Sequence, residues 1–384
     1  MTKRKQPKSK RARNVRVAIV GVGNCASALV QGVHYYQNKR NDGTVGLMHE
    51  NLDGLRPQDI KFVAAFDIDK RKVTKDISKA IFAKPNCAQI FQKTIPFLKC
   101  RVERGFLLDG VARHMLSHPD DRTFVIDEFL DDFCSAEDEA IAEKRISDSL
   151  KKKKVDVLIN LLPVGSEDAT RFYARCALNA GCAMVNGIPV FIASDKKWAD
   201  KFRKAGLPII GDDIKSQFGA TILHRMITRL LVERGAAVDR TYQLNTGGNT
   251  DFLNMLNRDR LASKKISKTE AVQSQLPTKL DKNDIHIGPS DYVPWQNDNK
   301  ICFIRVEGRV FGDIPFDLEV RLSVQDSPNS AGVLIDAVRL AKVALERNHK
   351  GPIFEASAYL MKHPPKQMTD DDAYDAVEKF ISGK

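Results

Sequence analysis

The chain has 384 residues and a net charge of +12, and 42% of its residues are hydrophobic. This length favours two linked domains. Because no apolar run approaches the ~18–20 residues that cross a bilayer, we expect no membrane span and no signal peptide. The seven cysteines form no CxxC pair, which argues against a disulfide framework or a resident metal site and favours a reduced, cytoplasmic protein.

The basic excess is concentrated at the N-terminus. Residues 3–13 hold seven basic side chains and no acidic one. Such a run is typical of a disordered, solvated arm, so we predict a disordered basic tail over residues 1–14. Because no aromatic side chain interleaves with these charges, we expect no specific nucleic-acid partner.

The segment from 15 to 216 alternates between short apolar runs and helical patterns. The apolar runs are continuous, as in a parallel sheet that is covered on both faces. Ser166 and Ser194 are predicted helix N-caps, and Gly181 and Gly206 are predicted helix ends. This rhythm predicts an α/β fold with a Rossmann-like, doubly wound parallel sheet. The predicted strands are 15–20, 62–66, 155–162, 183–185 and 207–210.

The pattern changes after residue 217. One long helix is predicted over 217–235, followed by more open strands and a final helix over 330–347. The strand at 318–324 alternates strictly, so one of its faces should contact water or another subunit. We therefore predict an α+β domain inserted over 218–326 and a Rossmann-like domain made of 15–217 and 327–384. The apolar positions of the long helix are Ile222, Met226, Leu230 and Leu231, and the other strands are 242–244 and 301–310.

A glycine motif follows the first predicted strand and opens a helix. Gly21 permits the tight turn, Gly23 lets the backbone approach a pyrophosphate, and Ala26 allows close packing of helix and strand. The amides of Asn24 and Cys25 then face the phosphates. The context of strand, turn and helix predicts a dinucleotide site.

An acidic residue is expected at the end of the second strand. Asp67 lies there, although its distance in sequence from the glycine motif is longer than usual, because the polar segment 38–59 reads as an inserted loop. A carboxylate at this position binds the ribose hydroxyls and repels a 2′-phosphate, so we expect NAD rather than NADP. A helix cap is the alternative interpretation of such an aspartate.

Four polar segments are the candidates for substrate chemistry. Residues 211–217 lie between a strand and a helix, where Ser216, helix amides and Lys215 could bind a phosphate. Residues 245–251 form a glycine turn, 263–268 carry lysines, and 326–332 precede a helix. Each alone is typical of a turn or a cap, but their joint presence beside a dinucleotide fold favours a substrate site.

These segments carry a family resemblance. The chain resembles the myo-inositol-1-phosphate synthase family, particularly its bacterial type. The resemblance covers most of residues 15–365 and leaves the basic tail outside. The strings that carry it are 17–27, 162–167, 211–217, 248–254, 263–268, 326–332 and 359–362.

The resemblance implies a redox-neutral isomerisation of glucose 6-phosphate to a myo-inositol monophosphate. In this family NAD oxidises C5 to a ketone, the acidified C6 attacks the C1 aldehyde, and the resulting inosose is reduced by the same cofactor. The reaction needs a phosphate cradle, a group that moves the C5 hydroxyl proton, and positive charge against the developing oxyanions.

The resemblance also assigns roles to residues. Lys264, Lys268 and Lys362 match active-site lysines, with Lys264 expected at C5 or near the nicotinamide. Asp251 and Asp326 match polar residues near the nicotinamide and the substrate. The substrate phosphate is expected at Ser216, Gln217, Asn249 and Lys268, and NAD at Gly21, Gly23, Asn24, Cys25, Ala26, Asp67, Asp76, Tyr173, Ser216, Asp251 and Lys264.

Some points stay open. The strand on which some family members carry a further lysine has Arg305 and Arg309 here, and neither is assigned a role. The resemblance implies that the domain of 15–217 and 327–384 binds NAD and that the inserted α+β domain of 218–326 serves catalysis and oligomerisation as a homotetramer, and it leaves room for an activating cation. The alternatives are a dehydrogenase of a phosphorylated substrate, which would release NADH, and an NAD-binding regulator that uses the basic tail on nucleic acid.

Overall fold

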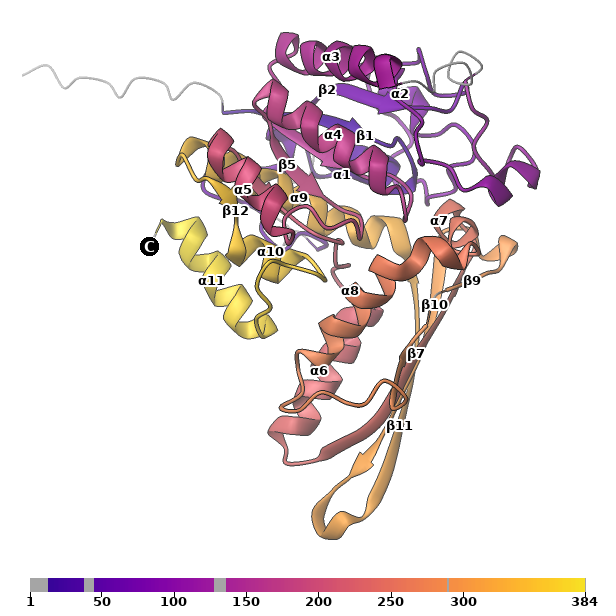
Figure 1. Ribbon diagram of the computed structural model, residues 1–384, viewed down its shortest axis with the longest axis vertical. Coiled ribbons are helices and arrows are strands. Elements are labelled where there is room, and N and C mark those ends of the chain that lie inside the picture. Colours follow the sequence, from indigo (N-terminus) through magenta and orange to yellow (C-terminus); the bar gives the residue numbers. More distant parts are fainter. Residues whose placement is uncertain (1–12, 38–44, 128–135, 289, 384) are drawn as a thin grey trace, which may run out of the picture.

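The structure, a computed structural model, describes residues 13–37, 45–127, 136–288 and 290–383 (Figure 1). Within these residues the first sheet has seven strands in the order β12-β6-β5-β4-β1-β2-β3, and all neighbours are parallel. This confirms the predicted doubly wound parallel sheet. The strands are β1 (Val15–Val20), β2 (Ile60–Asp67), β3 (Val102–Arg104), β4 (Val157–Asn160), β5 (Ala183–Asn186), β6 (Pro208–Ile210) and β12 (Gly351–Pro352).

Both faces of this sheet are covered, which explains the continuous apolar runs. Alternate residues of β1 enter different cores: Val17 and Ile19 face one side, and Ala18 and Val20 face the other. One core is shared with α1 (Asn24–Gln37), α2 (Ile77–Ala80), α9 (Asp326–Glu346), α10 (Phe354–Leu360) and α11 (Asp370–Ser382). The other core is shared with α3 (Ala136–Lys152), α4 (Glu167–Ala180) and α5 (Lys196–Ala205).

The predicted helix ends are right and one predicted cap is wrong. Gly181 and Gly206 end α4 and α5 in the left-handed region. Asp195 caps α5 by accepting from the amide of Trp198, whereas the hydroxyl of Ser194 donates to Asp212.

Ser166 does precede α4, but its hydroxyl donates to the carbonyl of Pro163 instead of capping the helix. The carboxylate of Asp109 accepts from the first amides of α4 in its place. A cap supplied from a distant segment leaves no local signal in the sequence.

The second sheet extends away from the first as a long wing (Figure 1). Its strand order is β11-β10-β7-β8, with β9 also paired to β7. Helix α6 packs on one face, and the other face leaves Leu244 and Phe303 more than 40% exposed. The exposure of β11 alternates, as predicted for 318–324. The elements are β7 (Ala237–Gly247), β8 (Ile285–Ile287), β9 (Asp291–Tyr292), β10 (Asn299–Arg309), β11 (Pro315–Gln325), α6 (Ala220–Glu233), α7 (Thr250–Asn254) and α8 (Ala262–Gln273).

Helix α6 buries polar residues and exposes apolar ones. Met226 and Leu230 are 45% and 57% exposed, whereas His224 and Arg225 are fully buried. Arg225 is satisfied by Asp370, at 2.8 Å, and by the carbonyls of Ala271 and Met368. Of the apolar positions that predicted this helix, Leu231 packs against the second sheet, whereas Met226 and Leu230 face outward.

Two further expectations change. Residues 326–332 were predicted to precede a helix, but α9 begins at Asp326, so they form its first turns. Residues 1–12 of the predicted tail and residues 38–44 of the predicted inserted loop lie outside the described residues. Arg13 forms ion pairs with Asp53 and Glu346. None of the described helices is long and apolar enough to cross a membrane. The domain boundaries stay a prediction.

Candidate functional site

A cavity opens where the carboxyl ends of β1, β2 and β4 meet the second sheet. Gly21, Asp67 and Leu161 line it from the first sheet, and Asn249 and Lys300 line it from the second domain. The carboxyl edge of a doubly wound sheet is the usual ligand site of this fold.

The glycine loop fits a dinucleotide. Gly21 has a φ of +86°, and a Cβ there would lie 2.7 Å from the carbonyl oxygen of Leu161, so only glycine makes this turn. A Cβ on Gly23 would meet no atom within 4 Å, so the loop keeps open space in front of its backbone, beside the N-terminus of α1. Ala26 is fully buried. Backbone amides facing open space at a helix N-terminus can bind a pyrophosphate.

The other residues expected at NAD line this end of the cavity. The side-chain oxygen of Asn24 accepts from the amides of Cys87 and Ala88. One carboxylate oxygen of Asp67 accepts from the amide of Val22 at 2.7 Å, which ties the acidic residue to the glycine loop.

Cys25 and Tyr173 both have perturbed pKa values. Burial raises the pKa of the Cys25 thiol to about 12, so this thiol stays protonated at neutral pH. Burial likewise raises the pKa of Tyr173, whose hydroxyl accepts from the amide of Phe106. Neither side chain is therefore a source of negative charge against a bound phosphate.

Three lysines meet aspartates around the same cavity. Nζ of Lys264 lies 3.0 Å from Asp251, and Nζ of Lys362 lies 2.8 Å from Asp213. Desolvation by burial opposes the ionisation of Asp251, but the hydrogen bond and charge of Lys264, with the charges of Lys300 and Lys268, lower its pKa.

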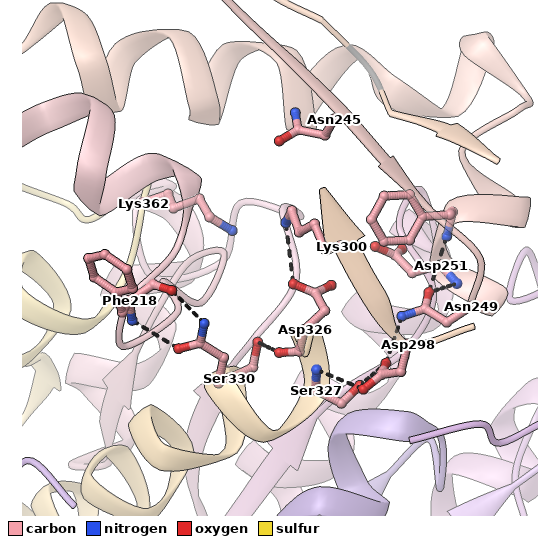
Figure 2. Close-up of polar contacts among 12 residues, drawn as sticks. Phe218, Asn245, Asn249, Asp251, Asp298, Lys300, Asp326, Ser327, Ser330 and Lys362 are labelled. Atoms are coloured by element: carbon pink, nitrogen blue, oxygen red, sulfur yellow. Dashed lines mark hydrogen bonds and ion pairs between the residues drawn. The ribbon is translucent and has the colours of Figure 1, made fainter. Parts of the chain in front are cut away.

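Lys300 forms the third of these pairs, and the sequence did not single it out. It extends from the start of β10 and lies 3.3 Å from Asp326, at the first turn of α9 (Figure 2). The carboxylate of Asp326 raises the pKa of Lys300 despite desolvation by burial. The pair joins the second sheet to the end of α9.

Lys268 differs from the other lysines. Its side chain comes from α8 and is only 5% exposed, and it takes part in none of the salt bridges found between described residues. Burial and the positive charges of Lys264 and Lys300 lower its pKa well below the usual value.

Asn249 lines the cavity and is held in place by Asp298. The oxygen of Asn249 caps α7 by accepting from the amide of Asp251, and its nitrogen donates to Asp298 (Figure 2). Burial and the nearby Asp326 raise the pKa of Asp298 to about 6, and Ser327 donates to the same carboxylate. No group of three or more His, Cys, Asp or Glu side chains that could hold a metal is found among the described residues.

Comparisons with known proteins agree with this geometry. A family model described as Myo-inositol-1-phosphate synthase matches residues 219–327. The inositol-3-phosphate synthase of Mycobacterium tuberculosis (strain CDC 1551 / Oshkosh) is 52% identical over 378 residues, which is 98% of each chain. This chain belongs to the inositol-3-phosphate synthase family. The predicted resemblance is therefore confirmed.

Further members of the inositol-3-phosphate synthase family agree. The enzyme of that name from Corynebacterium glutamicum is 51% identical and covers 96% of this chain and 98% of its own. The crystal structure of a myo-inositol-1-phosphate synthase-related protein from Thermotoga maritima has a TM-score of 0.80 at 25% identity, and covers 96% of this chain and 98% of its own.

Three residues of the phosphate and NAD predictions do not lie around the cavity of this family member. Asp76 caps α2 and accepts from the amides of Ser78 and Cys100. The side-chain amide of Gln217 donates to the backbone carbonyl of Gly46. Lys215, which could have bound phosphate, is buried and donates to Asp370 and the carbonyl of Ala358. Each of these side chains thus has a structural role within the protein that does not require a ligand.

The other expected site residues line the cavity: Gly21, Gly23, Asn24, Cys25, Ala26, Asp67, Tyr173, Ser216, Asn249, Asp251, Lys264, Lys268, Asp326 and Lys362. Arg305 and Arg309 do not. They form ion pairs with exposed carboxylates, among them Glu319 and Asp313. On this strand the lysine that lines the cavity is Lys300. Strand periodicity could have identified it, because Cys302 and Ile304 are buried on β10 and Lys300 lies on the same covered face.

Proposed function

We propose that this chain converts D-glucose 6-phosphate into 1L-myo-inositol 1-phosphate, with NAD bound throughout the cycle and no net change of redox state. The observation that carries the proposal is that one cavity holds both an open glycine loop and, besides Lys72, four further lysines, Lys264, Lys268, Lys300 and Lys362. A dehydrogenase needs only the first feature. An isomerase that forms and stabilises an enolate also needs the second.

NAD fits the first-sheet end of the cavity. The open backbone at Gly23 and the N-terminus of α1 suit its pyrophosphate, and Asp67 suits the ribose hydroxyls and disfavours the 2′-phosphate of NADP. When bound, NAD takes a hydride from C5 of the substrate and returns it to the cyclised product.

Side chains of both predicted domains would hold and polarise the sugar phosphate. We assign Lys264, held by Asp251, to the movement of the C5 hydroxyl proton. Lys268 and Lys362 bind the phosphate or a developing oxyanion, together with Ser216. Lysine suits both tasks because it carries compact positive charge and can lose a proton when it is desolvated.

Asn249, Asp326 and Lys300 complete the proposed substrate set. Asn249 uses its amide oxygen on the backbone and one N–H on Asp298, which leaves its second N–H for the substrate. Asp326 holds the ammonium of Lys300 in the cavity at 3.3 Å. We assign this ammonium to the substrate oxygen that gains negative charge.

We further propose that the protein is a cytoplasmic homotetramer. The exposed apolar residues of α6, Met226 and Leu230, and those of the outer sheet face, Leu244 and Phe303, support a second subunit on these surfaces. An activating cation belongs to the same proposal, since the carboxylates that line the cavity could share one with substrate oxygens.

The test is an incubation of the purified protein with glucose 6-phosphate and NAD, followed by chromatography and by absorbance at the NADH band. Inositol monophosphate without accumulating NADH is the expected result. Stoichiometric NADH without inositol phosphate would instead identify a dehydrogenase. No turnover with NAD still bound, together with salt-dependent DNA binding that requires residues 1–14, would identify a regulator.

A further inference from the structure

One lysine that lines the cavity has no part in the proposed mechanism. Lys72 lies in the segment between β2 and α2, and it lines the cavity together with Asp67. Its side chain is fully buried, so it can act on a bound cofactor only through the groups that it contacts. A buried ammonium is costly unless its surroundings hold it, and its contacts therefore indicate its role.

Two side chains hold this ammonium. Nζ of Lys72 donates to Oδ1 of Asn86 at 3.0 Å and lies 3.9 Å from Oδ2 of Asp67. The amide of Asn86 has only one possible orientation, because its NH2 group lies 3.0 Å from each of two carbonyl oxygens, those of Val22 and Ile81. Carbonyl oxygens can only accept. The oxygen of Asn86 must therefore face the ammonium of Lys72.

The same two side chains hold both polar groups of Val22, the residue between the two glycines of the loop. The carbonyl of Val22 accepts from Asn86. The amide of Val22 donates to Oδ2 of Asp67 at 2.7 Å, and this is the carboxylate oxygen that lies 3.9 Å from Lys72. Lys72 thus joins the two side chains that fix the middle of the glycine loop.

The hold on Val22 determines where the amide of Gly23 points. The carbonyl of Val22 and the N–H of Gly23 belong to one planar trans peptide, so they point in opposite directions. Because the carbonyl is turned to Asn86, the N–H of Gly23 is turned away from Asn86.

This N–H of Gly23 is a free donor. It has no acceptor among the backbone hydrogen bonds between described residues. Gly23 lines the cavity, and a Cβ on it would meet no atom within 4 Å. An N–H without an acceptor, beside open space at the start of α1, is a suitable donor for a phosphate oxygen.

We propose that Lys72 is a positioning residue for the cofactor: through Asn86 it fixes the peptide between Val22 and Gly23, with the N–H of Gly23 toward the pyrophosphate. This inference rests on the proposed function, because it places NAD at the glycine loop. Lys72 itself touches neither the cofactor nor the substrate. Its ammonium prevents the Asn86 amide from turning, and the amide prevents the peptide from turning.

The direct test is hydrogen–deuterium exchange of the purified full-length protein without added NAD, followed by mass spectrometry of peptides that cover residues 20–27. Lys72→Met keeps a side chain of similar length and removes the donor to Asn86. The hydrogen-bonded amides of Gly21, Val22 and Ser27 report on the loop.

The expected result is faster exchange of the glycine loop in Lys72→Met, with unchanged exchange in α6 and the second sheet. Unchanged exchange of the loop would overturn the proposal. Faster exchange throughout the chain would overturn it as well, because Lys72 would then serve general stability. This measurement needs no cofactor and no turnover.

A matched pair of variants tests the consequence for the cofactor. Lys72→Met should raise Kd for NAD about tenfold, because a hydrogen bond to a charged group is weakened. KM for glucose 6-phosphate, and kcat at saturating NAD, should change less than threefold. Lys75→Met, at an exposed lysine of the same segment, is the control and should change none of these values. A larger change in kcat than in Kd for NAD would overturn the proposal.

A second substitution tests the route through Asn86. Asn86→Ala removes the donor to the carbonyl of Val22 and should also raise Kd for NAD about tenfold. The double variant should bind NAD within twofold of Asn86→Ala alone, since both substitutions interrupt one route. A hundredfold increase in the double variant would refute the route. If Lys72→Met does not fold, an unchanged Kd in Asn86→Ala still overturns the proposal.

Failure of this inference and failure of the proposed function give different results. A wild-type protein that binds NAD but forms no inositol phosphate would refute the proposed reaction, and the exchange and Kd measurements on Lys72 would still decide the inference. A wild-type protein that forms inositol phosphate, with Lys72→Met binding NAD as tightly, would refute the inference alone.

Discussion

Replacement of Gly23 by alanine should separate cofactor binding from folding. A Cβ at this position meets no protein atom within 4 Å, so the fold accommodates it, and the free energy of unfolding should change by less than about 1 kcal/mol. The same methyl group occupies the space in which we place the pyrophosphate. The variant should therefore fold normally and bind NAD poorly.

The magnitude follows from the hydrogen bonds that the methyl group displaces. The added methyl group would clash with a phosphate oxygen that is hydrogen-bonded to a backbone amide of the loop. The pyrophosphate must therefore move away from the loop. The loss of two charge-assisted hydrogen bonds of about 1.5 kcal/mol each weakens binding by about 3 kcal/mol. This corresponds to a roughly 100-fold increase in Kd for NAD.

Gly21→Ala is the matched control. Here the added Cβ lies 2.7 Å from the carbonyl oxygen of Leu161 and requires a φ of +86°, so the free energy of unfolding should fall by about 2 kcal/mol. Equilibrium dialysis gives Kd for NAD, and denaturant titration gives the stability. If Gly23→Ala binds NAD as tightly as the wild type, the glycine loop is not the pyrophosphate site and the reasoning is wrong.

Three further predictions concern other parts of the molecule. Lys300→Met should lower kcat about 100-fold while Kd for NAD stays within twofold, because the ammonium beside Asp326 is proposed to act on the substrate and not on the cofactor. Rates of inositol phosphate formation measure this effect, and Lys282→Met, at an exposed lysine, is the control. Burial lowers the pKa of His224 from 6.5 to about 4; between these values the unfolded chain binds the extra proton, so stability is lost as the pH falls from 6.5 to 4. The loss of unfolding free energy over this range should be smaller in His224→Gln than in the wild type, and equal slopes would contradict it. Met226→Asp combined with Leu230→Asp should reduce the mass measured by light scattering toward the 43.0 kDa of one chain, because charges would replace apolar side chains that are about half exposed on α6.

The first domain could be predicted closely because its signals are local. The five inner strands of the parallel sheet coincide with the predicted apolar runs, whereas the edge strands β3 and β12 are short, lack such a run and were not predicted. Gly181 and Gly206 end their helices by a conformation that glycine adopts without strain. Asp67 ends β2 as predicted. Such features depend on a few neighbouring residues, so a single sequence contains them.

The second domain was predicted less well because its signals are not local. The apolar stripe of α6 predicts a buried face, but in the described chain Met226 and Leu230 are exposed while Arg225 is buried against Asp370, which lies 145 residues away. Likewise the sequence around Lys215 suggests a phosphate-binding lysine, but its ammonium group forms an ion pair with the same Asp370. Only the fold brings these charges together.

The lysines of the cavity show the same limit most clearly. Lys264, Lys300 and Lys362 each have an aspartate within 3.3 Å, so each carries a charge that is already compensated within the protein. Lys268 is buried without such a partner among the described residues, and burial lowers its pKa well below the usual value. A dianionic phosphate is the ligand that would raise this pKa again, since the nearby negative charge offsets the cost of burial. The substrate phosphate would therefore supply the negative charge that Lys268 lacks. The difference between Lys268 and the other three lysines follows from their surroundings alone, since the four side chains are chemically identical.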